Sequence, residues 1–393
     1  MRWLSLLVIA PLAGSVGPAQ AQSEHGAFVT TLGRDTVAID QYVRTPRFLD
    51  GALLIRSPVT RVVTYRALLR EDGTIERFES RWWTPSPDAG PPQPPDVVAT
   101  FMGDSVKVDY LRGADVRTVM VAAPAGTVPL VNSVYSAVLY EQALRQGMAA
   151  GGGSRDFSAT WLALDRRARV STTTMAARGA DSVSIEYFAG TMVARVDDAG
   201  HILGLTGQES TAKFSSERVM DVDMELVAAD FGARDAAGKG LGTMSPRDTT
   251  KATASGATIE IDYSRPSKRG RVVWGGVVPW NEIWRTGANR ATHFTTDKDL
   301  SIAGVAVPAG RYTLFTWPTP DETQLVISRQ TNQWGTVYDS TNDLARIPMR
   351  EMKLNEPVET FTIVVEEQER GGIIALDWDD RRYWVPFEVA GGM

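Results

Sequence analysis

Trp284, Arg285 and Asn289 place three kinds of ligand-binding side chain within one short stretch of the sequence. The guanidinium group of an arginine offers a planar fork of donors to a carboxylate, a phosphate or sugar hydroxyls. The asparagine amide both donates and accepts hydrogen bonds, and an indole offers a flat face on which a sugar ring or an apolar ligand can stack. Trp334, which precedes Gly335, is expected to supply a second stacking face. The stretch therefore predicts a binding site for a polar ligand such as a carbohydrate.

A glycine-containing segment just before this stretch adds further arginines, and segments of this kind between strands often carry binding residues. The predicted ligand-binding set is therefore Arg265, Arg271, Trp284, Arg285, Asn289 and Trp334. A second interpretation remains open, because structural ion pairs produce similar clusters. In that interpretation the arginines clamp a buried aspartate or loop carbonyls, and the tryptophans fill the core.

Residues suited to catalysis or metal binding are sparse. The chain has no cysteine, and its histidines His25, His201 and His293 do not have metal-ligand spacing. We therefore predict no catalytic residue, no metal site and no cofactor, although a hydrolase stays an alternative because carboxylates gather around one tryptophan. These carboxylates are expected to form a solvated face. They belong to Glu366, Glu367, Glu369, Asp377, Asp379 and Asp380, near Trp378.

The net charge of −6 is spread over both signs along the chain with no basic block, which argues against nucleic acid as a partner. Residues 1–21 combine a basic start, a short apolar run and an Ala-Gln-Ala end, the pattern of a secretory signal peptide. The apolar run is shorter than the ~20 residues that span a bilayer, so an uncleaved anchor is the less favoured alternative. We expect a periplasmic or secreted protein with no transmembrane segment after signal cleavage.

Short strand-like runs separated by polar turns dominate residues 22–231 and predict an all-β domain. Residues 61–70 and 74–83 flank an Asp-Gly turn, and residues 106–111 with 116–122 and 191–196 with 201–205 repeat the hairpin pattern. One helix is predicted over residues 132–146, with Asn132 as its cap and Gly147 at its end. We expect a curled antiparallel sheet or barrel with this helix either in its mouth or on its outer face.

Residues 232–256 are rich in Gly, Ala, Ser and Thr and predict a linker between two strand-rich regions. Residues 257–393 then show further strand-like runs and no helix of normal length, which predicts a C-terminal β-sandwich.

Several sequence blocks in this second region resemble the signature of DUF2911, a family of exported bacterial proteins known only as a domain of unknown function. The blocks are Ser245-Pro-Arg-Asp, Tyr263-Ser-Arg-Pro-Ser-Lys-Arg-Gly-Arg, Trp284-Arg-Thr-Gly-Ala-Asn, Pro308-Ala-Gly-Arg-Tyr-Thr-Leu-Phe and Gln333-Trp-Gly. The resemblance covers about residues 241–389, and Ser264 stands where members often have Gly. It implies an exported or periplasmic β-domain with no assigned reaction.

Together these observations predict an exported, non-catalytic binding or interaction protein of the bacterial envelope. Its ligand is expected to be a small molecule, a lipid or a carbohydrate, with the curled N-terminal sheet holding an apolar or amphiphilic ligand. Two alternatives stay open: a hydrolase acting on an envelope polymer or lipid, and a structural envelope scaffold without a small-molecule site.

Overall fold

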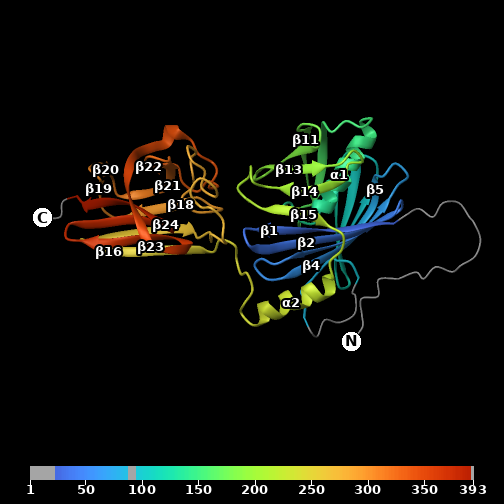
Figure 1. Ribbon diagram of the computed structural model, residues 1–393, viewed down its shortest axis with the longest axis horizontal. Coiled ribbons are helices and arrows are strands. Elements are labelled where there is room, and N and C mark those ends of the chain that lie inside the picture. Colours follow the sequence, from blue (N-terminus) through green and yellow to red (C-terminus); the bar gives the residue numbers. More distant parts are fainter. Residues whose placement is uncertain (1–22, 87–93, 391–393) are drawn as a thin grey trace, which may run out of the picture. The chain divides into compact units, whose positions relative to one another are not determined.

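The computed structural model describes residues 23–86 and 94–390, which form two compact units divided between Gly242 and Thr243. The predicted signal peptide, residues 1–21, lies outside the described residues. Both units are built almost entirely of strands (Figure 1), so the all-β prediction is confirmed. No helix in the described part of the chain is both long and apolar enough to cross a membrane.

The first unit is an antiparallel sheet of fifteen strands that curls around one helix, with a short parallel pair at one edge. Its strands are β1 (Glu24–Leu32), β2 (Asp35–Arg44), β3 (Phe48–Ile55), β4 (Arg61–Leu69), β5 (Ile75–Trp83), β6 (Val97–Phe101), β7 (Ser105–Arg112), β8 (Asp115–Ala122), β9 (Val128–Leu130), β10 (Phe157–Ala163), β11 (Arg169–Ala177), β12 (Ser182–Tyr187), β13 (Gly190–Val196), β14 (Ile202–Thr206) and β15 (Ser215–Val219). Its helices are α1 (Ala137–Ala150) and α2 (Met224–Ala236).

The strand order of this sheet is two meanders joined where β1 pairs with β15, the first and last strands of the unit. The sheet is open, with β8 and β9 at its edges, so of the two expected forms the curled sheet is the one observed rather than a closed barrel. All three predicted hairpins are present as β4–β5, β7–β8 and β13–β14.

Helix α1 begins five residues later than predicted and continues past Gly147. The Asn132 side chain accepts hydrogen bonds from the amides of Val134 (2.8 Å) and Tyr135 (3.0 Å), so it caps a turn before the helix rather than the helix itself. Gly147 lies inside the helix and does not end it. A glycine is needed at this position because the Phe157 ring packs where a side chain would be.

The two helices pack on opposite faces of the sheet, because successive side chains of β2 alternate between them. Ala38 and Tyr42 of β2 belong to the core around α1, whereas Ile39 belongs to the smaller cluster that packs on α2. Helix α2 was not predicted. It starts at an Asp223 cap that accepts from the Leu226 amide (2.9 Å).

The predicted linker, residues 232–256, is mostly regular structure. Helix α2 runs to Ala236, and strand β16 begins at Arg247. Only residues 237–246 between them lie outside helices and strands. The division between the two units falls within these residues, so the connecting segment is shorter than predicted. Edge strand β16 carries Thr on its exposed side, and composition alone did not separate it from a linker.

A buried ionic network fastens α1 to the sheet (Figure 1 shows the helix beside the strands). Asp40 of β2 accepts hydrogen bonds from the Val138 amide (3.0 Å) and the Tyr65 hydroxyl (3.1 Å), and it is only 1% exposed. Burial raises the pKa of Asp40 to about 8, so at neutral pH this carboxyl is protonated. Glu141 of α1 is fully buried and pairs with Arg218 of β15.

The second unit is a sheet of nine strands in the order β16-β17-β18-β21-β22-β23-β24-β19-β20. Their bounds are β16 (Arg247–Ala254), β17 (Ala257–Ser264), β18 (Thr292–Thr296), β19 (Leu300–Ile302), β20 (Val305–Val307), β21 (Gly310–Pro318), β22 (Thr323–Ser328), β23 (Asp343–Gln368) and β24 (Gly371–Val389), with one 3-10 turn, η1 (Ser340–Asn342). β23 pairs first with β22 and then with β24, and its second half lies against β16, where Thr250 donates to the Ile363 carbonyl (2.7 Å). The sheet therefore folds over itself into two layers around one core.

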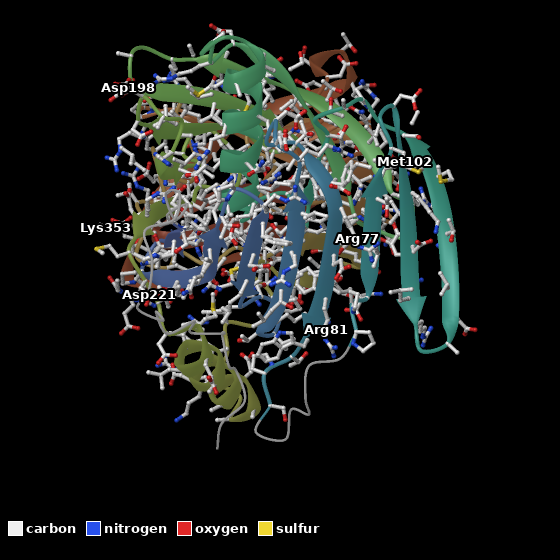
Figure 2. The ribbon with its side chains drawn as sticks, turned by 90° about the vertical axis from the view of Figure 1, so that its right-hand side faces the viewer. Arg77, Arg81, Met102, Asp198, Asp221 and Lys353 are labelled. Atoms are coloured by element: carbon white, nitrogen blue, oxygen red, sulfur yellow. The ribbon has the colours of Figure 1, made fainter. Side chains whose placement is uncertain are left out.

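Charges of both signs are spread over the surface of the first unit, including Arg77, Arg81, Asp198 and Asp221 (Figure 2). This distribution agrees with the absence of a basic block in the sequence.

We expect Asp40→Asn to stabilise the first unit increasingly as pH rises from 5 to 8. The folded protein keeps the Asp40 proton up to about pH 8, whereas an unfolded aspartate loses it near the ordinary aspartate pKa of 3.8. Unfolding of the wild type therefore releases a proton in this window and becomes easier as pH rises, while an asparagine has no proton to release. Hydrogen exchange of peptides from α1 should show a wild-type to variant rate ratio that grows with pH, by at most about tenfold per pH unit. A ratio that stays constant between pH 5 and pH 8 would contradict the buried, protonated Asp40.

Candidate functional site

The arginine-rich segment between β17 and β18 is tied to the second unit by backbone pairing along β21. Trp284 and Thr316 exchange two hydrogen bonds of 2.8 Å, and the Asn281 amide donates to the Pro318 carbonyl (2.8 Å). Because directly opposed residues of an antiparallel pair share a face, Trp284 and Thr316 both point toward the core, and Arg285 points to the other side.

Trp284 is part of the aromatic core. It is 7% exposed, and its indole stacks on Trp378 (5.9 Å between ring centroids) and meets Phe361 (5.1 Å) and Trp274 (6.1 Å) edge-on. No free face remains for a ligand, so the core-filling interpretation applies to this residue.

Arg265 joins two strands. Its guanidinium donates to the Asp248 carboxylate (2.9 Å), the Thr362 hydroxyl (2.8 Å) and the Phe361 carbonyl (3.2 Å). These bonds link β16 to β23 and occupy its nitrogens, which is the clamp that the second interpretation describes.

Arg271 closes its own loop. Its Nε donates to the Lys268 carbonyl (3.0 Å), and a terminal nitrogen donates to the Ser267 carbonyl (2.7 Å). Its neighbour Arg269 adopts φ 54°, the left-handed region that favours glycine, and its amide donates to Glu359 (2.8 Å). Arg265 and Arg271 therefore hold the fold and shape the loop.

Arg285 differs from both. Its aliphatic stem lies against Gly335, where an added Cβ would come within 2.6 Å of Cδ of Arg285. No carboxylate pairs with it among residues 23–86 and 94–390, and burial alone lowers the pKa of Arg285 to about 10. Desolvating a guanidinium without a counter-charge costs free energy in the protein. Strongly perturbed groups of this kind are candidates for binding a ligand of opposite charge.

Asn289 and Trp334 lie next to Gly335, against which the stem of Arg285 packs. The Asn289 carbonyl accepts from the Gly335 amide (3.1 Å), and Asn289 itself is exposed and adopts φ 59°. Arg290 and Trp334 face each other across an isolated antiparallel bridge, and the Trp334 side chain is 46% exposed. Three of the six predicted residues, Arg285, Asn289 and Trp334, are therefore brought together; we call them, with Gly335, the Arg285–Trp334 site.

A layer of polar side chains supports the loop that carries Trp334. His293 Nε2 accepts a hydrogen bond from the backbone amide of Asn332 (3.1 Å). The side-chain amide of Gln333 donates to the Thr313 hydroxyl (3.2 Å). His293 Nδ1 and the side-chain oxygens of Gln330 and Gln333 are buried without a hydrogen-bond partner in the described structure. Burial lowers the pKa of His293, and the nearby Arg311 and Arg247 lower it further, so the imidazole is neutral in a positive surrounding.

The sequence patterns indicated no role in a site for His293, Gln330 or Gln333. The signal that could have drawn attention to them is Gln333-Trp-Gly335, which holds a supporting amide, the exposed indole and the glycine against Arg285 in three consecutive residues.

Three of the carboxylates around Trp378 are engaged in ion pairs. Asp377 accepts two bonds of 2.7 Å from Arg382, which also binds Glu366 (2.8 Å), and Asp379 pairs with Lys268. Both oxygens of Asp377 are therefore held by one guanidinium, and these three carboxylates are not free for general acid and base work.

Metal ligands do not gather elsewhere either. Within residues 23–86 and 94–390 no group of three or more His, Asp or Glu residues could hold an ion. His201 bonds to Asp197 (2.8 Å) and lies 3.4 Å from Glu24, as part of the first unit's ionic network.

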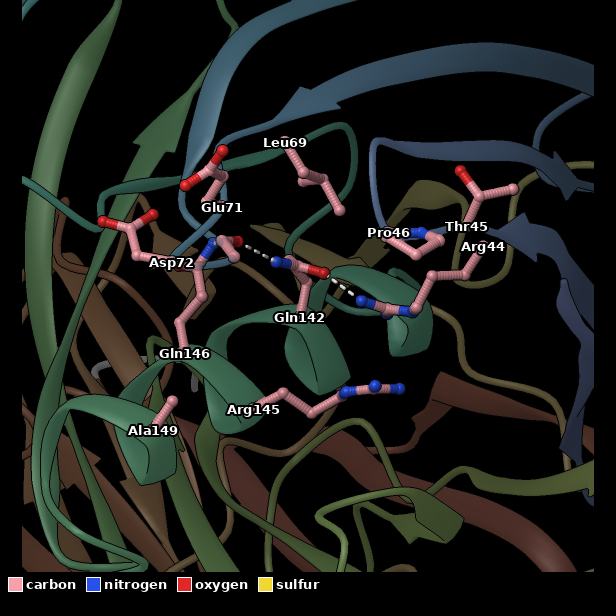
Figure 3. Close-up of a pocket in the computed structure, with 11 residues that line it drawn as sticks. Arg44, Thr45, Pro46, Leu69, Glu71, Asp72, Gln142, Arg145, Gln146 and Ala149 are labelled. Carbon is pink, nitrogen blue, oxygen red and sulfur yellow. Dashed lines mark hydrogen bonds between the residues drawn. The ribbon is translucent and has the colours of Figure 1, made fainter. Parts of the chain in front are cut away.

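A polar cleft of about 280 Å³ opens in the first unit between one face of α1 and the turns after β2 and β4 (Figure 3). Gln142 and Gln146 both donate to the Gly73 carbonyl (2.8 Å each), and Gln142 accepts from Arg44. Arg145, the other cation in the lining, pairs with Glu24 (2.8 Å). Two nitrogens of Arg44 and the side-chain oxygen of Gln146 are buried there without a hydrogen-bond partner among the described residues. Both arginines nevertheless lie near carboxylates of their own unit, Glu24 and Glu141, which makes this cleft the weaker candidate.

Stability measurements separate the two kinds of arginine. We expect Arg265→Met to lower the melting temperature of the second unit, because it leaves Asp248 and Thr362 without their donor, at a cost of about 1–2 kcal/mol after allowance for partial exposure. Arg285→Met keeps the aliphatic stem against Gly335 and removes an uncompensated charge, so its melting temperature should equal or exceed that of the wild type. A loss of folding in Arg285→Met would instead show that this guanidinium is structural.

Comparison with known proteins finds a family match for the second unit, and that family has no known reaction. No curated protein matches the chain. The family expected from the sequence blocks is confirmed, because residues 245–387, which include the Arg285–Trp334 site, match the family described as protein of unknown function (DUF2911).

Proposed function

We propose that this protein is an exported, non-catalytic binding protein of the bacterial envelope, and that the Arg285–Trp334 site holds a carbohydrate that bears carboxylate groups. The observation that carries the proposal is the guanidinium of Arg285, which is desolvated and has no carboxylate partner in the described part of the chain. A bound carboxylate would supply the missing counter-charge in the bidentate geometry that arginine favours.

The surroundings of Arg285 support a sugar as the carrier of that carboxylate. The exposed indole of Trp334 offers a flat apolar face, and Asn289, on the segment that carries Arg285, offers a donor and an acceptor. Arg290, which is exposed and has no ion pair with a described carboxylate, faces Trp334 across the bridge. This excess of cations favours an acidic sugar over a neutral one.

The engaged carboxylates argue for binding rather than hydrolysis. A glycoside hydrolase needs two carboxyl groups at a fixed separation. Arg285 has no carboxylate next to it among the described residues. Near Trp378, Arg382 holds Asp377 and Glu366, and Lys268 holds Asp379. The structural support for an enzyme is therefore weaker than that for a binding site.

The first unit is not the ligand-binding unit in this proposal. The face of its sheet that was expected to hold an apolar or amphiphilic ligand is packed against α1, whose Val138 and Leu139 are fully buried there. Export rests on the signal-peptide pattern of residues 1–21.

We expect the wild type to bind oligogalacturonate more tightly than a neutral maltooligosaccharide of similar length in isothermal titration calorimetry. Arg285→Met and Trp334→Ala should each weaken this binding by about tenfold or more, the equivalent of ~1.4 kcal/mol or more. Added salt should weaken the binding of oligogalacturonate to the wild type, because the attraction is partly between exposed charges.

The matched control is Trp82→Ala in the first unit, since Trp82 is 37% exposed and lies outside the site. This variant should bind as the wild type does. If uronate, sialylated and sulfated glycans on an array all fail to bind the wild type, or if Arg285→Met binds as well as the wild type, the proposal is wrong and a scaffold role is favoured.

A further inference from the structure

The outer face of the second unit carries a row of arginines and tryptophans on neighbouring strands. Along β23, Arg346, Pro348 and Arg350 are exposed, while the alternate residues between them are buried in the core. Trp317 of β21 and Trp384 of β24 lie on this same face; with Arg346 and Arg350 they form what we call the arginine–tryptophan face (strands labelled in Figure 1).

The four side chains are stacked in two pairs. The guanidinium carbon of Arg346 lies 5.6 Å from the centre of the Trp317 ring, and that of Arg350 lies 4.8 Å from the centre of the Trp384 ring. Arg350 and Trp384 are directly opposed in the β23–β24 register, which keeps them together on one face. Both indoles are half-buried, so each stacked pair presents part of an aromatic surface and a cation to solvent.

The two arginines differ in the charge that they leave available. Arg346 is fixed by Asp343 (3.0 Å) and by the Tyr338 hydroxyl (2.6 Å). Arg350 has no ion pair with any carboxylate that the structure describes, so its positive charge is uncompensated on this face. The far end of the face therefore resembles the Arg285–Trp334 site in composition, with an unpaired arginine beside an indole.

The face is continuous with the Arg285–Trp334 site through the loop that carries Trp334. Tyr338 of this loop packs its ring on Phe315 of β21 (4.9 Å) and binds Arg346 through its hydroxyl. Phe315 and Trp317 lie on the other side of β21 from Thr316, which points to the core with Trp284. Phe315 is covered there and only 1% exposed, whereas Trp317 is half-buried. Arg285 follows Trp284 and therefore lies on the same side of the sheet as Trp317.

We propose that this face binds an extended acidic polysaccharide chain, which runs from the Arg285–Trp334 site to the Arg350–Trp384 pair. The inference rests on the proposed function, since it extends that same site. The Arg285–Trp334 site lies in loops beside β21, and the Arg350–Trp384 pair lies on β23 and β24, with β22 in between. At a spacing of ~4.8 Å between neighbouring strands, one sugar ring cannot contact both. A polymer contacts both at once, and the second contact is then made at high effective concentration.

The test compares galacturonic acid with a long oligogalacturonate in calorimetric titrations of the full chain. The wild type should bind the oligomer at least tenfold more tightly than the monomer. Trp384→Ala and Arg350→Met should weaken oligomer binding by about tenfold and leave monomer binding unchanged, whereas Trp334→Ala should weaken both.

Arg381→Met is the matched control, because Arg381 also lies over a tryptophan, Trp280 (5.8 Å), but alternates to the opposite side of β24 from Trp384. With its melting temperature checked, this variant should bind the oligomer as the wild type does. Equal affinity for monomer and oligomer, or oligomer binding unaffected by Trp384→Ala and Arg350→Met, would overturn the extended face while leaving the proposed function intact. No binding of either probe would count against both.

Discussion

The burial of Trp284 is the constraint on which the candidate site depends. Its backbone exchanges two hydrogen bonds with Thr316, and its indole is enclosed by Trp378 and Phe361, so its direction in the sheet is set by the core. Because side chains alternate along an extended chain, the next residue, Arg285, must point outward against Gly335. Burial of the Trp284 indole therefore offsets the free-energy cost of holding the Arg285 guanidinium partly desolvated and without a counter-charge. Local departures of this kind from favourable interactions are expected at candidate sites.

The arginines of one short segment differ in the hydrogen-bond and ion-pair partners that the folded chain places near them. Arg265 reaches a carboxylate, a hydroxyl and a carbonyl, and Arg271 reaches two carbonyls of its own loop. For Arg285 burial alone shifts the pKa, with no nearby charge among the described residues to oppose it. Composition cannot separate these cases, because each depends on which residues, distant in sequence, the fold brings within hydrogen-bond distance. The structural interpretation therefore applies to Arg265 and Arg271, and the proposed binding role is confined to Arg285 within the same segment.

Much of the fold could be predicted from local patterns, and the misses have local causes. The Asp72-Gly73 turn between alternating runs predicted the β4–β5 hairpin because its geometry is set by adjacent residues. The start of α1 was misplaced because the Asn132 side chain closes a turn instead, and α2 was missed in a chain dominated by strands. Of the six residues grouped from the sequence, Arg285, Asn289 and Trp334 are the ones that the structure brings close together. Which indole is exposed was not predictable, because it depends on pairing with β21.

The two units use buried and exposed charge in opposite ways. In the first unit Glu141 pairs with Arg218, and Asp40 is held protonated by burial, so charge is neutralised within the chain to fix the position of α1. Such buried pairs add little net stability, but they specify one arrangement. In the second unit Arg285, Arg290 and Arg350 have no carboxylate partners among the described residues, although the whole chain carries a net charge of −6. Since screening limits the reach of the distant negative charges to about 8 Å at physiological salt, the local positive groups decide what can approach this face.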